Sequence, residues 1–154
     1  MRLARAADKL SEAGYTVVFL PMHIASTDDD LAEIGSIRGS MIMPSHFLTK
    51  TLEPHTAAAF LGSASIVVGL RLHSLILAAS QGVPVVSVGY DEKIRGFMDY
   101  AGIGGCVVEP VELANKSLVV AARGEKSGVV LSGSCSVMKA RIREEASALV
   151  ESLG

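Results

Sequence analysis

The sequence contains no tryptophan, only two cysteines and no long apolar run. Cys106 and Cys135 stand far apart with no Cys-x-x-Cys pattern, so we expect two reduced thiols rather than a disulfide or a metal site. No stretch reaches the roughly 18 uninterrupted apolar residues that a membrane-spanning helix requires, so no membrane span is expected. Without tryptophan, an aromatic platform for stacking sugars is less expected, although sugar binding is not thereby excluded.

The sequence also has no excess of positive charge. Lys and Arg number 14 against 16 Asp and Glu, the formal net charge is −2, and no basic stripe stands out, which argues against nucleic acid as a partner. The four histidines are scattered, so no spacing indicates a metal site, and no cofactor is expected. Residues 1–9 are charged and carry no secretory apolar segment, which predicts a cytoplasmic protein.

Apolar residues are plentiful: 49% of the 154 residues are hydrophobic, and the mean hydropathy is +0.42. This is ample for a core, and we expect residues 1–154 to form a single domain. Short β-branched runs alternate with helix-like segments along the chain. The alternation predicts an α/β fold with a parallel sheet that helices cover on both faces.

The expected elements follow from periodicity and from the positions of Gly and Pro. Helices are expected near 2–13, 26–38, 54–62, 72–81, 94–101, 111–122 and 137–153, and strands near 15–20, 41–43, 66–68, 83–88 and 106–108. Residues 44–51 and 124–136 are expected to be mainly loop. The Ser-Thr-Asp-Asp-Asp run at 26–30 is interpreted as an N-cap and an acidic first turn with no further role.

The segment from Ile66 to Pro84 is the centre of this pattern. A β-branched strand, Gly69, a helical stretch and a second strand follow one another, which predicts a β-α-β unit. Arg71 and His73 stand where the first strand passes into the helix. A helix N-terminus attracts phosphate or carboxylate, Arg adds a matching fork of donors, and His exchanges protons near neutral pH. The alternative is that Arg71 pairs with a neighbouring carboxylate and His73 packs as a polar core residue.

Polar side chains follow several of the expected strands. In open parallel sheets, ligands bind beyond the carboxyl ends of the strands. Three such ends carry polar groups: His23, then Arg71 with His73, then Tyr90 with Asp91 and Lys93. We therefore expect a binding site for an anion at this edge of the sheet, with His23 and Lys93 as secondary contacts.

Three motifs surround these residues: Gly-Leu-Arg-Leu-His-Ser at 69–74, Gly-Val-Pro at 82–84 and Tyr-Asp-Glu-Lys at 90–93. At these spacings the chain resembles the C-terminal, donor-binding half of the polysaccharide pyruvyl transferase family. The Pro-Met-His strand end at 21–23 and the acidic helix start at 28–29 are similar as well. The resemblance is clear over residues 1–103 and only general beyond them.

The resemblance implies a Rossmann-like domain similar to the C-terminal lobe of a B-type glycosyltransferase fold, with the active cleft between two lobes. It implies transfer of the pyruvyl group of phosphoenolpyruvate to two hydroxyls of a cell-surface sugar, which gives a cyclic ketal. Its partners would be phosphoenolpyruvate and a glycan acceptor.

The resemblance also implies roles for single residues. Arg71 would bind the anionic donor, and His73 would act as a general acid or as a donor to the phosphate. The other residues assigned to substrate binding are Gly69, Ser74, His23, Tyr90, Asp91 and Lys93.

Two departures from the family pattern matter. We expect the chain to lack the N-terminal, acceptor-binding half and the strand that precedes the first helix, which is central in a doubly wound sheet. Either the strand ending at Leu20 pairs directly with the one ending at Gly69, or another chain fills the gap. Both options expose apolar surface, which predicts a homo-oligomer or a separate N-terminal lobe.

Other functions stay open at this point. The chain could be a non-catalytic lobe that binds phosphoenolpyruvate or a nucleotide-like anion, or a structural fragment. A lobe of a nucleotide-sugar glycosyltransferase is the related enzyme alternative, although the Arg-Leu-His tripeptide at 71–73 favours pyruvyl transfer. Pyruvyl transfer itself would require an acceptor-binding lobe to complete the site.

Overall fold

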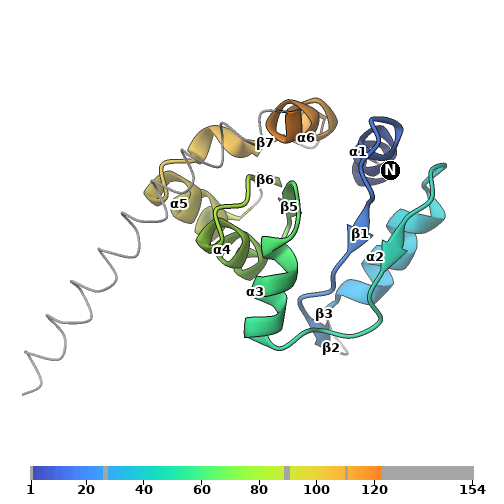
Figure 1. Ribbon diagram of the computed structural model, residues 1–154, viewed down its shortest axis with the longest axis horizontal. Helices are drawn as coiled ribbons and strands as arrows, with labels where there is room; N and C mark the ends of the chain where they lie inside the picture. Colours follow the sequence, from blue (N-terminus) through green and yellow to red (C-terminus); the bar gives the residue numbers. More distant parts are fainter. Residues whose placement is uncertain (1, 26–27, 89–90, 110, 123–154) are drawn as a thin grey trace, which may run out of the picture.

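The computed structural model describes residues 2–25, 28–88, 91–109 and 111–122 (Figure 1). The helices are α1 (Arg2–Glu12), α2 (Asp30–Gly39), α3 (Pro54–Gly62), α4 (Leu72–Ser80), α5 (Glu92–Tyr100) and α6 (Leu113–Ala122), with a 3-10 turn, η1, at Gly104–Cys106. The strands are β1 (Val18–Phe19), β2 (Ile24–Ala25), β3 (Asp28–Asp29), β4 (His46–Phe47), β5 (Val67–Gly69), β6 (Val85–Val88) and β7 (Val107–Val108). The loop and helix predicted at 124–136 and 137–153 lie outside the described residues.

The main strands form two parallel sheets. In the first, β1 pairs with β4, with Val18 opposite His46. In the second, the order is β5-β6-β7, with Gly69 opposite Ser87. A short antiparallel pair, β2 with β3, leads into α2. Parallel strands joined by helices confirm the predicted Rossmann-like α/β class.

Helices pack on both faces of the second sheet. Val85 belongs to an apolar cluster with Leu75 of α4 and Met98 of α5. Its neighbour Val86 belongs to a second cluster with Leu113 of α6. Because successive side chains of a strand point to opposite faces, α4 and α5 cover one face and α6 covers the other. Helix α1 packs beside α6 (Figure 1).

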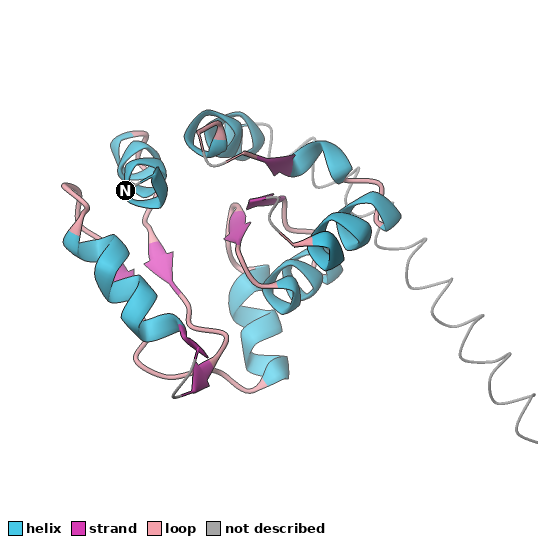
Figure 2. Cartoon of the chain, turned by 180° about the vertical axis from the view of Figure 1, so that it is seen from behind, coloured by secondary structure: helices cyan, strands magenta, loops and turns pink. Residues whose placement is uncertain are grey.

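The two sheets are not joined to each other in the described part of the chain. No backbone pairing connects β1 with β5, so the first of the two alternatives, direct pairing between the strands ending at Leu20 and Gly69, is wrong. Figure 2 shows the same arrangement from behind, with β1, α1 and α2 on one side and β5 with its helices on the other. None of the helices described here is both long and apolar enough to cross a membrane.

The strand predicted at 41–43 is wrong. The backbone N–H groups of Ile42 and Met43 donate to the carboxylate of Asp8 in α1, at 3.0 and 2.8 Å from its Oδ1. This buried carboxylate holds the segment as a turn, and the Ile42 side chain is 92% exposed. The carboxylate therefore takes up the N–H groups that a strand partner would have used.

The strand lies instead at β4, inside the segment predicted to be loop. Arg38 at the end of α2 holds this segment: its guanidinium stacks 4.1 Å from the ring centre of Phe47, and its Nε donates to Ser45 Oγ at 3.2 Å. Backbone N–H groups of His46 and Leu48 then donate to carbonyls of the β1 region. The contacts of Arg38 thus hold the segment where His46 lies opposite Val18 of β1.

Cys106, in η1, is half-buried, and this burial raises the pKa of its thiol, while the charge of Lys116 partly offsets the rise. Since the thiolate is the reactive form, we expect iodoacetamide at pH 8 to modify Cys106 about tenfold more slowly in the folded protein than in urea. Mass spectrometry of a Cys135→Ser variant measures the two rates. Equal rates would contradict the protection that the structure gives this thiol.

Candidate functional site

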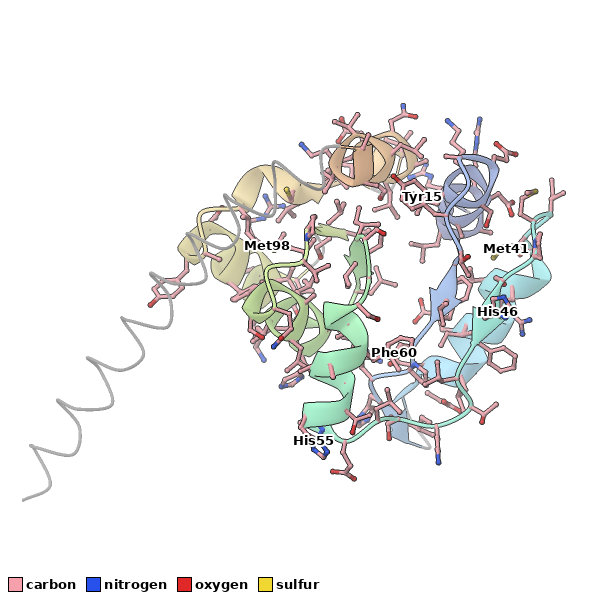
Figure 3. The ribbon with its side chains drawn as sticks, in the orientation of Figure 1. Tyr15, Met41, His46, His55, Phe60 and Met98 are labelled. Atoms are coloured by element: carbon pink, nitrogen blue, oxygen red, sulfur yellow. The ribbon has the colours of Figure 1, made fainter. Side chains whose placement is uncertain are left out.

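A cavity of about 640 Å³ lies between β1 and β5. Both strands contribute to its walls, and so do α1, α2, α3 and α6. Tyr15, just before β1, and Phe60 of α3 are among its lining residues and are labelled in Figure 3. The groups around the carboxyl ends of β1 and β5 are partly polar: Met22, Asp30, Gly69, Leu70, Arg71 and Ser74. This end of the cavity is where a doubly wound sheet binds its ligands.

Asp30 joins the ends of the two strands. Its Oδ1 accepts hydrogen bonds from Arg71 Nε at 3.0 Å and Nη2 at 2.7 Å. Its Oδ2 accepts from the backbone N–H groups of Met22 and His23, at 2.8 and 2.9 Å. The Asp30 side chain is 11% exposed and that of Arg71 is 35% exposed. The guanidinium is therefore held in one place and still reaches solvent.

The local sequence explains how Asp30 reaches this position. Asp29 is the N-cap of α2, since its backbone is extended and its Oδ1 accepts from Leu31 N at 2.9 Å. Asp30 is then the first helical residue, and its own N–H donates to the His23 carbonyl at 3.1 Å. Helical side chains tilt toward the N-terminus, which directs this carboxylate to the chain leaving β1.

Arg71 is the N-cap residue of α4 and has an extended backbone. Its carbonyl accepts from the N–H of Ser74 at 3.1 Å and from its hydroxyl at 2.7 Å. Gly69 lets the helix start this close to β5, because a Cβ there would lie 2.5 Å from Leu75 Cδ2. The first-turn N–H groups of α4, with the positive end of its dipole, thus begin beside the guanidinium.

The structure brings some of the predicted site residues together and leaves others apart. Gly69, Arg71 and Ser74 line the cavity. His23 contributes its backbone to the Asp30 network, while its side chain is exposed and outside the lining. His73 follows Arg71 in the first turn of α4 and is also exposed, so the alternative of a packed core histidine is wrong.

The third predicted group lies on the next helix. Asp91 is the N-cap of α5, and its Oδ1 accepts from the backbone N–H of Lys93 at 2.8 Å. Both side chains are exposed, and neither lines the cavity. They follow β6, whose carboxyl end lies at the same edge as that of β5. Tyr90 lies outside the described residues.

Asp30 is the site residue that the sequence pattern did not reveal. The acidic run was interpreted as an N-cap and an acidic first turn with no further role. The cap is Asp29 and Asp30 does lie in the first turn, but the absence of a further role is wrong for Asp30, which binds Arg71. The alternative that Arg71 pairs with a neighbouring carboxylate is confirmed. One sequence signal could have revealed Asp30. It is the third acid in a row and follows the N-cap Asp29, in the turn after a predicted strand, so it is not needed for capping.

This geometry favours an anion. The guanidinium is a fork of N–H donors, of which Nε and Nη2 bond to Asp30, and the helix N-terminus adds backbone N–H groups. Since Asp30 balances part of the positive charge, affinity would depend on oriented donors more than on net charge. Over the described residues, no group of three or more His, Cys, Asp or Glu is placed to hold a metal ion.

Comparison with protein families identifies a relationship over more than half of the chain. The family model for polysaccharide pyruvyl transferase matches residues 1–92, which include the Asp30 network and the first turn of α4. Lys93 lies one residue beyond the match. No solved structure matches the chain.

Proposed function

The chain belongs to the polysaccharide pyruvyl transferase family, and from this membership we propose that it is a donor-binding lobe that takes up phosphoenolpyruvate at the N-terminus of α4. The observation that carries the proposal is the Arg71 guanidinium, held by two hydrogen bonds to Asp30 Oδ1 at the polar end of the cavity. An acceptor-binding lobe would lie across the same edge of the sheet. A homo-oligomer stays a prediction.

Phosphoenolpyruvate suits this arrangement because it carries a phosphate and a carboxylate on one small carbon skeleton. Arg71 binds one of these groups through its guanidinium, and the first-turn N–H groups of α4 bind the same or the other one. Ser74 and Gly69 shape the floor beneath them, since both line the cavity. His23 and Lys93 add contacts from the two flanking strand ends.

His73 is the proposed general acid. Its side chain is exposed in the first turn of α4, the same turn whose backbone N–H groups are proposed to bind the anion. In ketal formation the methylene carbon of the donor gains a proton, one sugar hydroxyl adds to the neighbouring carbon, and phosphate leaves as the second hydroxyl closes the ring. Of the two hydroxyl protons, one balances the new methyl group and the other leaves with phosphate. Proton delivery to the methylene carbon is the step assigned to His73.

Arg71→Ala tests the donor site. Phosphoenolpyruvate at 100 times its dissociation constant should stabilise the wild-type chain by about 2.7 kcal/mol and shift its thermal midpoint upward. The shift should vanish in Arg71→Ala and shrink in Arg71→Lys, because an ammonium group cannot present the guanidinium fork. Thermal melting followed by circular dichroism measures this, with inorganic phosphate and a uridine diphosphate sugar as comparison ligands.

Arg5→Ala is the matched control, because it removes the same charge from an exposed position on α1. It should leave the phosphoenolpyruvate shift unchanged. Stabilisation by the nucleotide sugar alone would favour a glycosyltransferase lobe. No shift with any of the three ligands would overturn the donor site and leave a structural role.

A further inference from the structure

The slot between β1 and β5, defined as the cavity of about 640 Å³ that separates them, has a strand edge on each side. We propose that it receives one β-strand, parallel to both, which leads directly into α1. This inference is independent of any ligand, since it concerns the middle of the sheet and not the anion site at its end.

The backbone of β1 presents one edge to the slot. On the side away from it, His46 N–H donates to the Val17 carbonyl and Leu48 N–H to the Phe19 carbonyl. Backbone groups of successive strand residues point alternately to the two edges, so those of Val18 point to the slot. No hydrogen bond joins them to any described residue across it.

The backbone of β5 presents the second edge. Val67 N–H donates to the Pro84 carbonyl, and Val67 and Gly69 lie opposite β6 residues. By the same alternation, the N–H and carbonyl of Val68 face the slot. A parallel strand between two edges of equal direction can pair with both of them along their length, and it satisfies the backbone groups of both at once.

The walls of the slot fit such a strand. Helices line it with apolar side chains: Leu3, Ala6 and Leu10 of α1, Ile37 of α2, Phe60 of α3 and Leu113 of α6. A strand between these helices is buried on both faces, so its residues must be apolar on both.

The strand order names the source of the occupant. With the slot filled, the sheet reads β4-β1-slot-β5-β6-β7, which is the doubly wound order 3-2-1-4-5-6 with the occupant as its first strand. The first strand of that order precedes the helix that leads to the second strand, and this helix is α1. A right-handed crossover through α1 then sets the occupant beside β1.

The test adds the strand to the full chain. A variant carries Val-Ile-Val-Ile-Val and a four-residue Gly/Ser loop ahead of Met1, and its control carries Val-Ile-Pro-Ile-Val and the same loop, because proline cannot donate to a ladder. We expect the aliphatic extension to slow hydrogen exchange of the Val18 and Val68 amides about tenfold and the control to leave them unchanged. The thermal midpoint should rise by about 5 °C with the aliphatic extension only.

A second probe covers the case in which the extended chain aggregates. A synthetic peptide, acetyl-Lys-Val-Ile-Val-Ile-Lys-amide, is added to the unextended chain, and the same two amides are followed by NMR. Slower exchange of the two amides with the peptide supports the proposal. If neither extension nor the peptide changes the exchange rates of these amides, the proposal is overturned. Sedimentation measures the oligomeric state of the unextended chain. If this chain is a dimer and its Val18 and Val68 amides are already protected, a second copy fills the slot, which would also overturn the proposal.

Discussion

Asp30→Ala is expected to lower the free energy of unfolding by about 2–4 kcal/mol. The substitution removes the acceptor of the Met22 and His23 N–H groups, and a hydrogen bond to a charged group contributes about 1.5–3 kcal/mol. The lost ion pair adds less, because the Arg71 side chain is 35% exposed and water screens its charge. Urea unfolding followed by circular dichroism measures the change.

Asp29→Ala is the matched control, one residue earlier in the same turn. It removes an exposed cap that accepts a single bond from Leu31 N, which should cost about 1 kcal/mol. Asp30→Asn keeps one oxygen acceptor and should fall between the two alanine variants. Equal losses for Asp29→Ala and Asp30→Ala would mean that Asp30 acts only as part of the helix cap and does not join the two strand ends.

The elements with strong local signals could be predicted from the sequence. Helix α3 begins at Pro54 and ends at Gly62 as expected, because proline fits the first helical turn and residues 57–61 are continuously apolar. The turn from β5 into α4 was also placed correctly, since a β-branched run, a glycine and a helical pattern follow one another. Such signals lie within a few residues of the element that they define.

The features that depend on distant partners could not be predicted. The Arg71–Asp30 pair joins residues 41 positions apart, and the bond from Met43 to Asp8 spans 35 positions. Nothing near Ile42 in the sequence shows that its N–H is taken by a carboxylate of α1. The strand order is another such feature: the sequence left open whether β1 and β5 pair directly or have a gap between them, and only the structure shows that they flank a common slot.

Gly69→Ala is expected to lower the free energy of unfolding by about 2–3 kcal/mol. A Cβ at this position would lie 2.5 and 2.7 Å from Leu75 Cδ2 and Cγ and 2.9 Å from Ser74 Oγ. Neither neighbour can give way easily, since Leu75 is fully buried and the Ser74 hydroxyl is bonded to the Arg71 carbonyl. Helix α4 must move from β5, which also displaces the anion site. Urea unfolding measures the loss of stability.

Gly96→Ala separates this steric effect from the general effect of replacing glycine. Gly96 lies in α5, where an added Cβ would meet nothing within 4 Å, so the alanine should stabilise the helix by about 0.5–1 kcal/mol. A double-mutant cycle then identifies the clashing partner: in a Leu75→Ala background, Gly69→Ala should cost at least about 1 kcal/mol less than in the wild type. If the cost is the same in both backgrounds, the contact with Leu75 is not what requires glycine at the end of β5.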